Sequence, residues 1–577
     1  MKAFKLLSNL LLARQLQCAL TLLMSSLLLV YSVASANTQG GDFSNHTVFH
    51  NFDGFTFTGE PGNNARLLNF SVMVVANGKI VATGTSQLVD NYQGAKKVDL
   101  MGRTLIPGLI DAHGHISSLG ENLTQVDVRG TTSRTQAVAT VANYADDNLH
   151  HEWIVGRGWN QELWPDRQFP TRQDLDEVIS DRPVWLVRVD AHAGWANSKA
   201  LELAGITDDT VDPPGGQIIR DNSGKATGVL IDTAMAMVQA VLPEATDEQL
   251  AEVNDKAFQH LLSLGITQVH DAGVDARRLN IFKQLAEANQ LPLRVNAMIA
   301  SSEPRLAELL AAGPYRSDND MLQINSVKVY GDGALGSRGA RLIEPYSDDA
   351  DNIGLLINPE DRVRELFSLT HNHGFQINYH AIGDYTNRLA LNEFARLAES
   401  EHSYRHRIEH AQIVSMEDIP RFLALDIIPS MQPTHATSDM NMAEDRVGSE
   451  RIAGAYAWRE FLDQGSLIAA GSDFPVELAN PFYGIHAAVT RQDRDNQPVE
   501  GWYPEQRMTL QEALRSFTLD AAYAGHYEQE TGSLEPGKWA DFIVLDQNPL
   551  RMKVEDLWRV RVEYTFVAGK EVYKRPI

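Results

Sequence analysis

The stretch LIPGLIDAHGHISSLG, residues 105–120, decides the fold. An apolar run ends at Asp111, and His113 and His115 follow with only Gly114 between them. Because successive side chains of a strand point to opposite faces, histidines at positions i and i+2 point to the same side. Two neutral imidazoles at a strand end suit a divalent ion such as Zn²⁺, but two histidines that make hydrogen bonds within a loop would give the same pattern. Whether these histidines bind a metal or make loop hydrogen bonds depends on which other residues the chain places at strand ends.

Apolar runs like this one recur along the middle of the chain and alternate with amphipathic helical patterns. Seven further runs lie at 266–273, 293–300, 324–333, 375–384, 406–414, 426–435 and 466–475. Eight strands with helices between them predict an α/β fold, a parallel (β/α)₈ barrel of the TIM type, over residues 107–531. Periodicity alone also permits an open doubly wound sheet, but no glycine-rich phosphate-binding motif follows the first strand.

Short alternating strands occupy both ends of the chain outside this barrel. Asn77-Gly78 marks a hairpin in residues 45–106, and residues 532–577 have the same strand-rich pattern. We expect a small β-sandwich built from both termini. Residues 121–260, between the first two barrel strands, predict an insertion with a β-rich subdomain beside the barrel mouth, where such loops shape substrate access. The insertion is rich in tryptophan: Trp153, Trp159, Trp164, Trp185 and Trp195.

Residues 1–36 have the pattern of a signal peptide. Basic residues precede an apolar run that ends in the small residues Ala34-Ser35-Ala36. The alternative is a permanent membrane anchor, since the run is nearly long enough to span a bilayer. The polar segment that begins at Asn37 favours cleavage. We therefore expect a protein exported to the periplasm or secreted, with no stable membrane association after cleavage.

The mature chain is acidic and lacks cysteine. The full sequence has 577 residues, with 50 Lys and Arg against 75 Asp and Glu, a net charge of −25. Without the three basic residues of the signal peptide, 47 against 75 gives −28. Such a surface should repel nucleic acid and anionic membranes. The single Cys18 lies in the signal peptide, so no disulfide is expected. The expected partners are a small molecule and, as a homodimer, a second copy of the chain.

Three later strand ends carry residues of types that bind metals. His380, His410 and Asp473 each stand where an apolar run meets a loop. The carboxyl ends of parallel barrel strands share one rim, so these side chains should converge with His113 and His115. Four histidines and an aspartate at the same end of four strands favour a metal site over separate structural roles.

Lys328 lies on the fourth strand and points inward by its alternation with Val327 and Val329. A buried ammonium is costly unless it is paired or neutralised. Reaction with CO₂ would convert the amine into a carbamate, an anionic ligand able to bridge two cations. The alternative is an ion pair with Asp332 or Asp384.

Taken together, these motifs resemble the amidohydrolase superfamily, specifically its amidohydrolase-3 branch, which includes N-substituted formamide deformylases. The resemblance covers nearly the whole mature chain, through IPGLIDAHGH, VKVYGDGALGS, HAIGD, RIEHAQ, GSDFPV and GSLEPGKWADFIVLD. It implies a metal site of six residues: His113 and His115 on one ion, His380 and His410 on a second, carboxylated Lys328 as a bridge, and Asp473 as ligand and general base.

The activity implied is that of an exported metal-dependent hydrolase, acting with water activated by one or two divalent ions, Zn²⁺ above all. The bond expected to break is a carbon–nitrogen bond other than a peptide, of amide or N-acyl type. One alternative keeps the site and hydrolyses an ester or lactone. Another is a non-catalytic exported binding or regulatory protein on the same scaffold.

Five further residues are candidates for substrate contact. Arg338 could clamp a substrate carboxylate or pair with an acidic neighbour. His192 lies in VDAHAGWANS, which resembles the motif that the amidohydrolase-3 branch has in its inserted domain. Asp232 is a polar residue of the same inserted segment. His435 ends the seventh strand, and His270 ends the second, where it could equally support the metal ligands.

Overall fold

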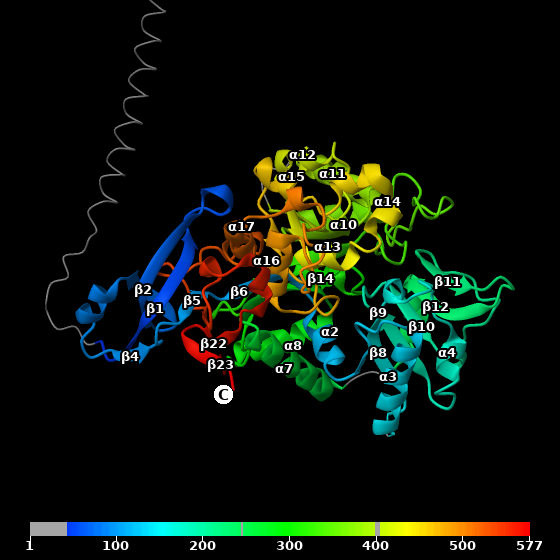
Figure 1. The fold of residues 1–577 in the computed structure, drawn as a ribbon, viewed down its shortest axis with the longest axis horizontal. Coiled ribbons are helices and arrows are strands. Elements are labelled where there is room, and N and C mark those ends of the chain that lie inside the picture. Colours follow the sequence, from blue (N-terminus) through cyan, green and yellow to red (C-terminus); the bar gives the residue numbers. More distant parts are fainter. Residues whose placement is uncertain (1–42, 150, 244–245, 399–403, 577) are drawn as a thin grey trace, which may run out of the picture.

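The computed structural model describes residues 43–149, 151–243, 246–398 and 404–576. The predicted signal peptide lies outside the described residues. Figure 1 shows a barrel, coloured green to orange, between a blue and red sheet on one side and a cyan sheet on the other. Within the described ranges, no helix has the length and apolar character needed to cross a membrane.

Eight parallel strands form the barrel, and each corresponds to one of the eight apolar runs. Their order is β20-β19-β18-β17-β16-β14-β13-β6. A parallel bridge between Gly114 and Phe474 joins the end of β6 to the segment after β20, which nearly closes the sheet. The predicted TIM-type barrel is therefore confirmed. The strands are β6 (Leu109–Gly114), β13 (Ile266–Val274), β14 (Arg294–Ala300), β16 (Leu322–Tyr330), β17 (Gln376–Ala381), β18 (Arg407–His410), β19 (Ile428–Met431) and β20 (Ala469–Ala470).

Helices between these strands bury their apolar faces in the core of the barrel. The helix α7 begins with a capping box, in which Thr246 and Gln249 each satisfy the other's backbone N–H, and it buries Phe258 and Leu261. The helices are α2 (Ile116–Asn122), α7 (Asp247–Ser263), α8 (Ala276–Glu287), α9 (Leu306–Ala311), α10 (Glu360–Asn372), α11 (Asp384–Leu397), α12 (Ile419–Ala424), α13 (Pro433–Asp439), α14 (Ala443–Arg451), α15 (Trp458–Asp463), α16 (Pro481–Thr490), α17 (Leu510–Ser516) and α18 (Leu519–Ala524). A two-residue strand, β15 (Tyr315–Arg316), pairs with β16 in the antiparallel direction.

Strands from both ends of the chain share one eight-stranded sheet. Its order is β23-β22-β21-β5-β1-β2-β3, and β4 pairs with β1. The apolar side chains of this sheet form a separate core. In it Phe542 and Phe566 stack with ring centroids 4.3 Å apart. The strands are β1 (His46–Thr58), β2 (Arg66–Ala76), β3 (Lys79–Gly84), β4 (Lys96–Asp99), β5 (Thr104–Pro107), β21 (Phe542–Leu545), β22 (Val562–Val567) and β23 (Lys570–Lys574).

The insertion after β6 contains a six-stranded sheet of order β11-β12-β10-β9-β8-β7. Its tryptophans lie in its own apolar cores rather than at the barrel mouth. The helix α7, in which the predicted insertion ends, packs in the barrel core. The elements are β7 (Val126–Asp127), α3 (Arg134–Asp147), β8 (Ile154–Trp159), α4 (Arg172–Asp176), β9 (Val184–Arg188), β10 (Ala193–Ala196), α5 (Ser198–Leu203), β11 (Gly216–Arg220), β12 (Ala226–Asp232) and α6 (Ala236–Gln239).

A buried ion pair joins the barrel to the terminal sheet. The guanidinium of Arg294 donates to both oxygens of Asp541, with distances of 2.6 and 3.1 Å. Asp541→Ala is expected to lower the free energy of unfolding by about 3–5 kcal/mol, because it leaves a buried charge without its partner. Denaturant unfolding measures the change. Exposed Glu571→Ala is the control, expected within about 0.5 kcal/mol of wild type; equal effects of the two substitutions would contradict the prediction.

Candidate active site

The six residues expected to bind metal form one cluster at the carboxyl ends of the barrel strands. Lys328 Nζ lies 2.8 Å from His113 Nε2, and Asp473 Oδ1 lies 3.7 Å from the same nitrogen. His115 Nε2 lies 3.0 Å from Asp473 Oδ1. The ring of His410 lies 4.8 Å from that of His113 and 4.5 Å from that of His380, measured between centroids. Residues from five strands or strand ends therefore meet in one place.

Three of the histidines are oriented through their Nδ1 atoms. His113 Nδ1 contacts the carboxylate of Glu409, His115 Nδ1 lies 2.8 Å from the carbonyl of Ala272, and His410 Nδ1 lies 2.8 Å from Gln432 Oε1. Each partner is an oxygen that accepts, so Nδ1 carries the proton in the neutral ring. Nε2 then presents its lone pair to the cluster, as metal ligation requires.

A chain of buried side chains lies beneath the cluster. Arg407 forms an ion pair with Glu409 and donates a hydrogen bond from Nη2 to Oε2 at 3.0 Å, and Glu409 in turn contacts His113. His270 Nδ1 lies 2.9 Å from Nη1 of Arg407. Nearby, Asp111 accepts hydrogen bonds from the backbone of His113 and from Ser472, which ties β6 to the loop that carries Asp473. These contacts fix the ligands before any ion binds.

Burial dominates the electrostatics of the cluster. It lowers the pKa of His113 to about 4 and that of Lys328 to about 8, because both charged forms are deprived of water. For Asp473, burial raises the pKa, but the neighbouring imidazoles of His115, His113 and His410 outweigh it, so its pKa falls well below the usual range. Burial raises the pKa of Asp332, which lies 3.6 Å from His380 Nε2, to about 7.

The backbone at two of the cluster residues is in the left-handed region. His410 has φ of 72° and Asp473 has φ of 59°. Non-glycine residues occupy this region at an energetic cost, and such residues concentrate at functional sites. Contacts such as the hydrogen bond from the Asp473 N–H to the His113 carbonyl, 2.7 Å, hold that conformation.

The donor set fits a divalent cation. Nε2 of His115 and Oδ1 of Asp473 are both acceptors, yet they lie 3.0 Å apart, an arrangement that a cation or a proton stabilises. His380 Nε2 is buried and has no hydrogen-bond partner among the described residues. Atoms of His113, His410 and Asp473 lie within 4.8 Å of one another. Neutral imidazole and carboxylate are ligands that Zn²⁺ favours.

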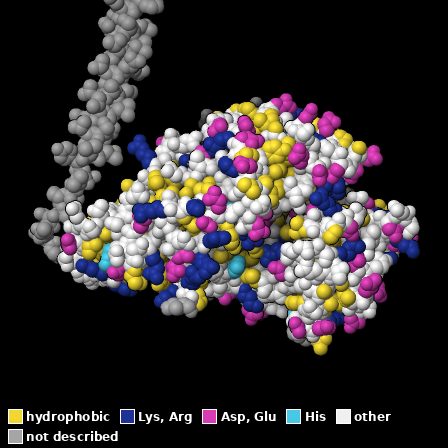
Figure 2. All heavy atoms as spheres, viewed as in Figure 1, with side chains coloured by type: hydrophobic (Ala, Val, Ile, Leu, Met, Phe, Trp, Pro, Cys, Tyr) yellow, Lys and Arg dark blue, Asp and Glu magenta, His cyan; other side chains and the backbone are white. Residues whose placement is uncertain are grey.

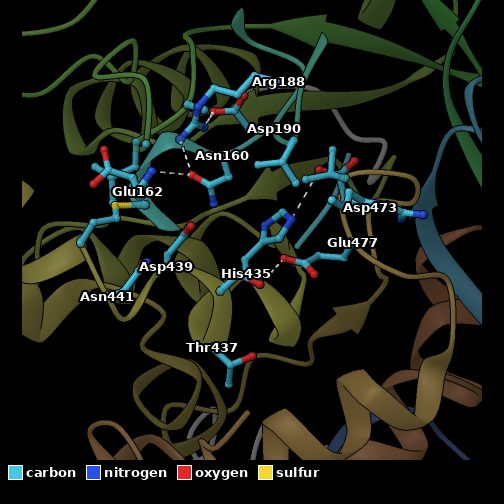
Figure 3. Close-up of a pocket in the computed structure, with 18 of the residues that line it drawn as sticks. Asn160, Glu162, Arg188, Asp190, His435, Thr437, Asp439, Asn441, Asp473 and Glu477 are labelled. Atoms are coloured by element: carbon cyan, nitrogen blue, oxygen red, sulfur yellow. Dashed lines mark hydrogen bonds and ion pairs between the residues drawn. The ribbon is translucent and has the colours of Figure 1, made fainter. Parts of the chain in front are cut away.

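A cavity of about 660 Å³ opens above the cluster. Figure 3 shows that its wall comes partly from the inserted sheet, through Asn160, Glu162, Arg188 and Asp190, and partly from the barrel loops after β19 and β20. Figure 2 shows basic and acidic side chains intermingled over the face of the molecule that it presents.

The five substrate candidates divide into two groups. His192 and His435 line the cavity, and Asp232 holds His192 through Nδ1 at 2.6 Å. The other two, Arg338 and His270, lie outside the cavity lining, in agreement with the alternative role stated for each. Arg338 pairs with Asp348 at 2.9 Å outside the cavity lining, because this carboxylate follows in the same loop. His270 is fully buried under the cluster, so it supports ligands through Arg407 and touches no substrate.

Several site residues were not anticipated. Arg407 and Glu409 are fully buried in β18, and their charge inside an apolar strand was the available signal. Asn160, Arg188 and Asp190 follow or end strands of the inserted sheet, and nothing in the local sequence indicates that they face the barrel.

Comparisons with known proteins agree with this geometry. The sequence profile described as the amidohydrolase family matches residues 96–573. Protein LONG AFTER FAR-RED 3 of Arabidopsis thaliana is 33% identical over 518 residues, 87% of this chain and 88% of that protein. N-substituted formamide deformylase of Arthrobacter pascens is 26% identical over 520 residues, which are 87% of this chain and 95% of that protein. An uncharacterized metal-dependent hydrolase from Pyrococcus horikoshii has a similar structure, with a TM-score of 0.71 and 27% identity over 88% of this chain and 99% of that one. The resemblance seen in the motifs is confirmed, and this chain belongs to the amidohydrolase family.

Proposed function

We propose that the protein is a metal-dependent hydrolase that cleaves a carbon–nitrogen bond other than a peptide bond, of amide or N-acyl type. The observation that carries the proposal is the convergence of His113, His115, Lys328, His380, His410 and Asp473 under one cavity. The name of the deformylase relative supports the choice of an amide over an ester or lactone.

The four histidines, Asp473 and Lys328 would hold one or two divalent ions, with Zn²⁺ favoured by the nitrogen-rich donor set. Bound ions would supply polarisation of the substrate carbonyl and acidification of water. Glu409 keeps the lone pair of His113 Nε2 directed at the cluster, and Gln432 does the same for His410.

Asp473 moves the proton in the proposed reaction. Its carboxylate takes a proton from the attacking water as the new carbon–oxygen bond forms, and returns a proton to the leaving nitrogen as the carbon–nitrogen bond breaks. It is suited to both steps because it borders the cavity and lies between His115 and His435, 3.0 and 3.6 Å away.

Lys328 is proposed to be carboxylated. Its Nζ contacts His113 Nε2 rather than Asp332 or Asp384, whose carboxylates accept backbone N–H groups. The amine thus lies among the proposed ligands, where an anionic carbamate would add a bridge between two cations.

Metal analysis and a substrate panel test the proposal. Protein purified without added ions is expected to contain about one to two divalent ions per chain, because hydrolytic metal sites hold either one ion or two. The zinc-loaded enzyme should release amine from N-formyl or N-acetyl compounds. Activity on esters alone would indicate the esterase alternative, and absence of metal with unchanged folding after added zinc and bicarbonate would indicate the non-catalytic one.

We also propose that the protein is exported, on the strength of the basic and apolar pattern of residues 1–36. Mass measurement of the protein from its native cell should show a chain that begins at Asn37. An intact N-terminus in the mature protein would contradict cleavage at this position.

A further inference from the structure

The cavity wall carries more carboxylates than the metal cluster uses. Three of them pair with an arginine, and Asp493 accepts the backbone N–H groups of Asp495 and Gln497. Arg188 pairs with Asp190, Arg129 pairs with Asp127 at 2.5 Å, and Arg446 pairs with Glu162 at 2.6 Å. These three pairs leave little net charge on the part of the wall that comes from the inserted sheet.

Asp439 and Glu477 are different, because neither forms an ion pair with a lysine or arginine among the described residues. Asp439 accepts hydrogen bonds from Tyr456 Oη at 2.7 Å and Gln412 Nε2 at 3.0 Å, and Glu477 accepts from Ser438 Oγ. These donors are neutral; the nearby basic groups that favour the charged carboxylates are His435 for both and Arg188 for Asp439, at longer range than an ion pair. Burial raises the pKa of both carboxyls, which shows that the surroundings disfavour the two charges.

The two carboxylates lie on neighbouring elements of the cavity wall. Asp439 is one helical turn after His435 on α13, so the two side chains share a face of that helix. Glu477 follows Asp473 by four residues in the loop after β20. Figure 3 shows His435 between Asp439 and Glu477. His435 is only 9% exposed, lines the cavity, and its Nε2 has no hydrogen-bond partner among the described residues.

Among the described residues, the same wall offers an anionic substrate one arginine without an ion pair, Arg494. The guanidinium of Arg188 already donates to Gln161 at 2.8 Å, to Asn160 at 3.0 Å and to Asp190. Arg338 is occupied by Asp348 outside the cavity. The guanidinium of Arg494 lies over the ring of Tyr483, 4.6 Å from its centroid. A substrate carboxylate would therefore pair with Arg494 or displace an existing ion pair, whereas a cation would gain two carboxylates that have no lysine or arginine partner among the described residues.

We infer that the substrate carries a second, positively charged nitrogen, an ammonium or guanidinium group, which Asp439 and Glu477 bind while His435 contacts the polar atoms beside it. The inference rests on the proposed function, since it places the amide to be cleaved at the metal cluster. The substrate class is therefore a basic amide, such as a singly acylated diamine.

Three matched amides test this inference. They are an acetylated aliphatic diamine, the same amide with a terminal methyl group in place of the ammonium, and the same amide with a terminal carboxylate. Full-length zinc-loaded enzyme is used to measure kcat/KM for each compound. Binding is measured by calorimetry on two samples, the protein as purified and the zinc-loaded Asp473→Asn variant. The ammonium compound is expected to be preferred over the methyl compound by about tenfold to a hundredfold, the range of a hydrogen bond between charged groups.

Glu477→Gln and Asp439→Asn are each expected to reduce this preference by about tenfold, and the double variant should bring the ratio close to one. The control is Glu450→Gln, which removes an equal charge from an exposed position on α14 outside the cavity lining and should keep the wild-type ratio. Equal use of the methyl and ammonium compounds, or a preference that survives the double variant, would overturn the inference while the hydrolase proposal stands. Selective binding of the ammonium compound without any amide cleavage would overturn the hydrolase proposal and support the binding site.

Discussion

Asp473→Asn is expected to lower kcat by about a thousandfold, within the range that a positioned acid–base group contributes. The amide side chain preserves shape and one oxygen ligand, but it cannot take a proton from water or return one to the leaving nitrogen. Since His113, His115, His380 and His410 remain, much of the metal should stay bound. The variant therefore separates proton transfer from metal binding.

Steady-state kinetics with metal analysis of the same samples gives both quantities. Asp495→Asn is the matched control, because Asp495 is exposed and lies outside the cavity lining. It should retain wild-type kcat and metal content. A fully active Asp473→Asn enzyme would remove this residue from the proton transfer.

Lys328→Ala is expected to lower activity by about a hundredfold or more, since even residues that only support metal ligands commonly cost that much. The substitution removes the proposed bridge and leaves a gap beside His113, whose Nε2 lies 2.8 Å from the lysine nitrogen. Acetate or propionate can enter such a gap and supply the missing carboxylate oxygens. Partial recovery of activity with either carboxylate is therefore expected.

Two readouts accompany this experiment. Wild-type protein incubated with isotopically labelled bicarbonate should show a carbamate signal that Lys328→Ala lacks. The control is Lys256→Ala, which replaces an exposed lysine on α7 and should show the wild-type signal and activity. Failure of carboxylates to rescue, together with an absent carbamate signal, would leave Lys328 as an unmodified amine next to His113.

The barrel was predictable because its strands are apolar and short, and the intervening helices carry a clear periodicity. Lys328 also followed the alternation rule, since it is 1% exposed and points into the cluster. His410 reached the cluster by a different route. In β18 the alternation of Arg407 and Glu409 directs those two inward, and the left-handed φ of His410 lets its side chain join them. The histidine was identified from its motif, whereas the pair beneath it was not.

The parts that were missed depend on contacts between distant segments. Arg188 and Asp190 belong to the inserted sheet, and only the packing of that sheet against the barrel brings them to the cavity. Local patterns carry no information on such packing.

The shared terminal sheet has a consequence for synthesis of the chain. The strand β5 pairs with β21, as Leu105 with Val544, and only Gly108 separates β5 from β6 and its two histidines. The strand that leads into the metal-binding segment has β1 on one side early, but it lacks its second neighbour, β21, until almost the whole polypeptide has left the ribosome. We expect the hydrolytic centre to mature only after translation ends, and a chain shortened by its last strands to lose order beside His113 even though every ligand is still encoded.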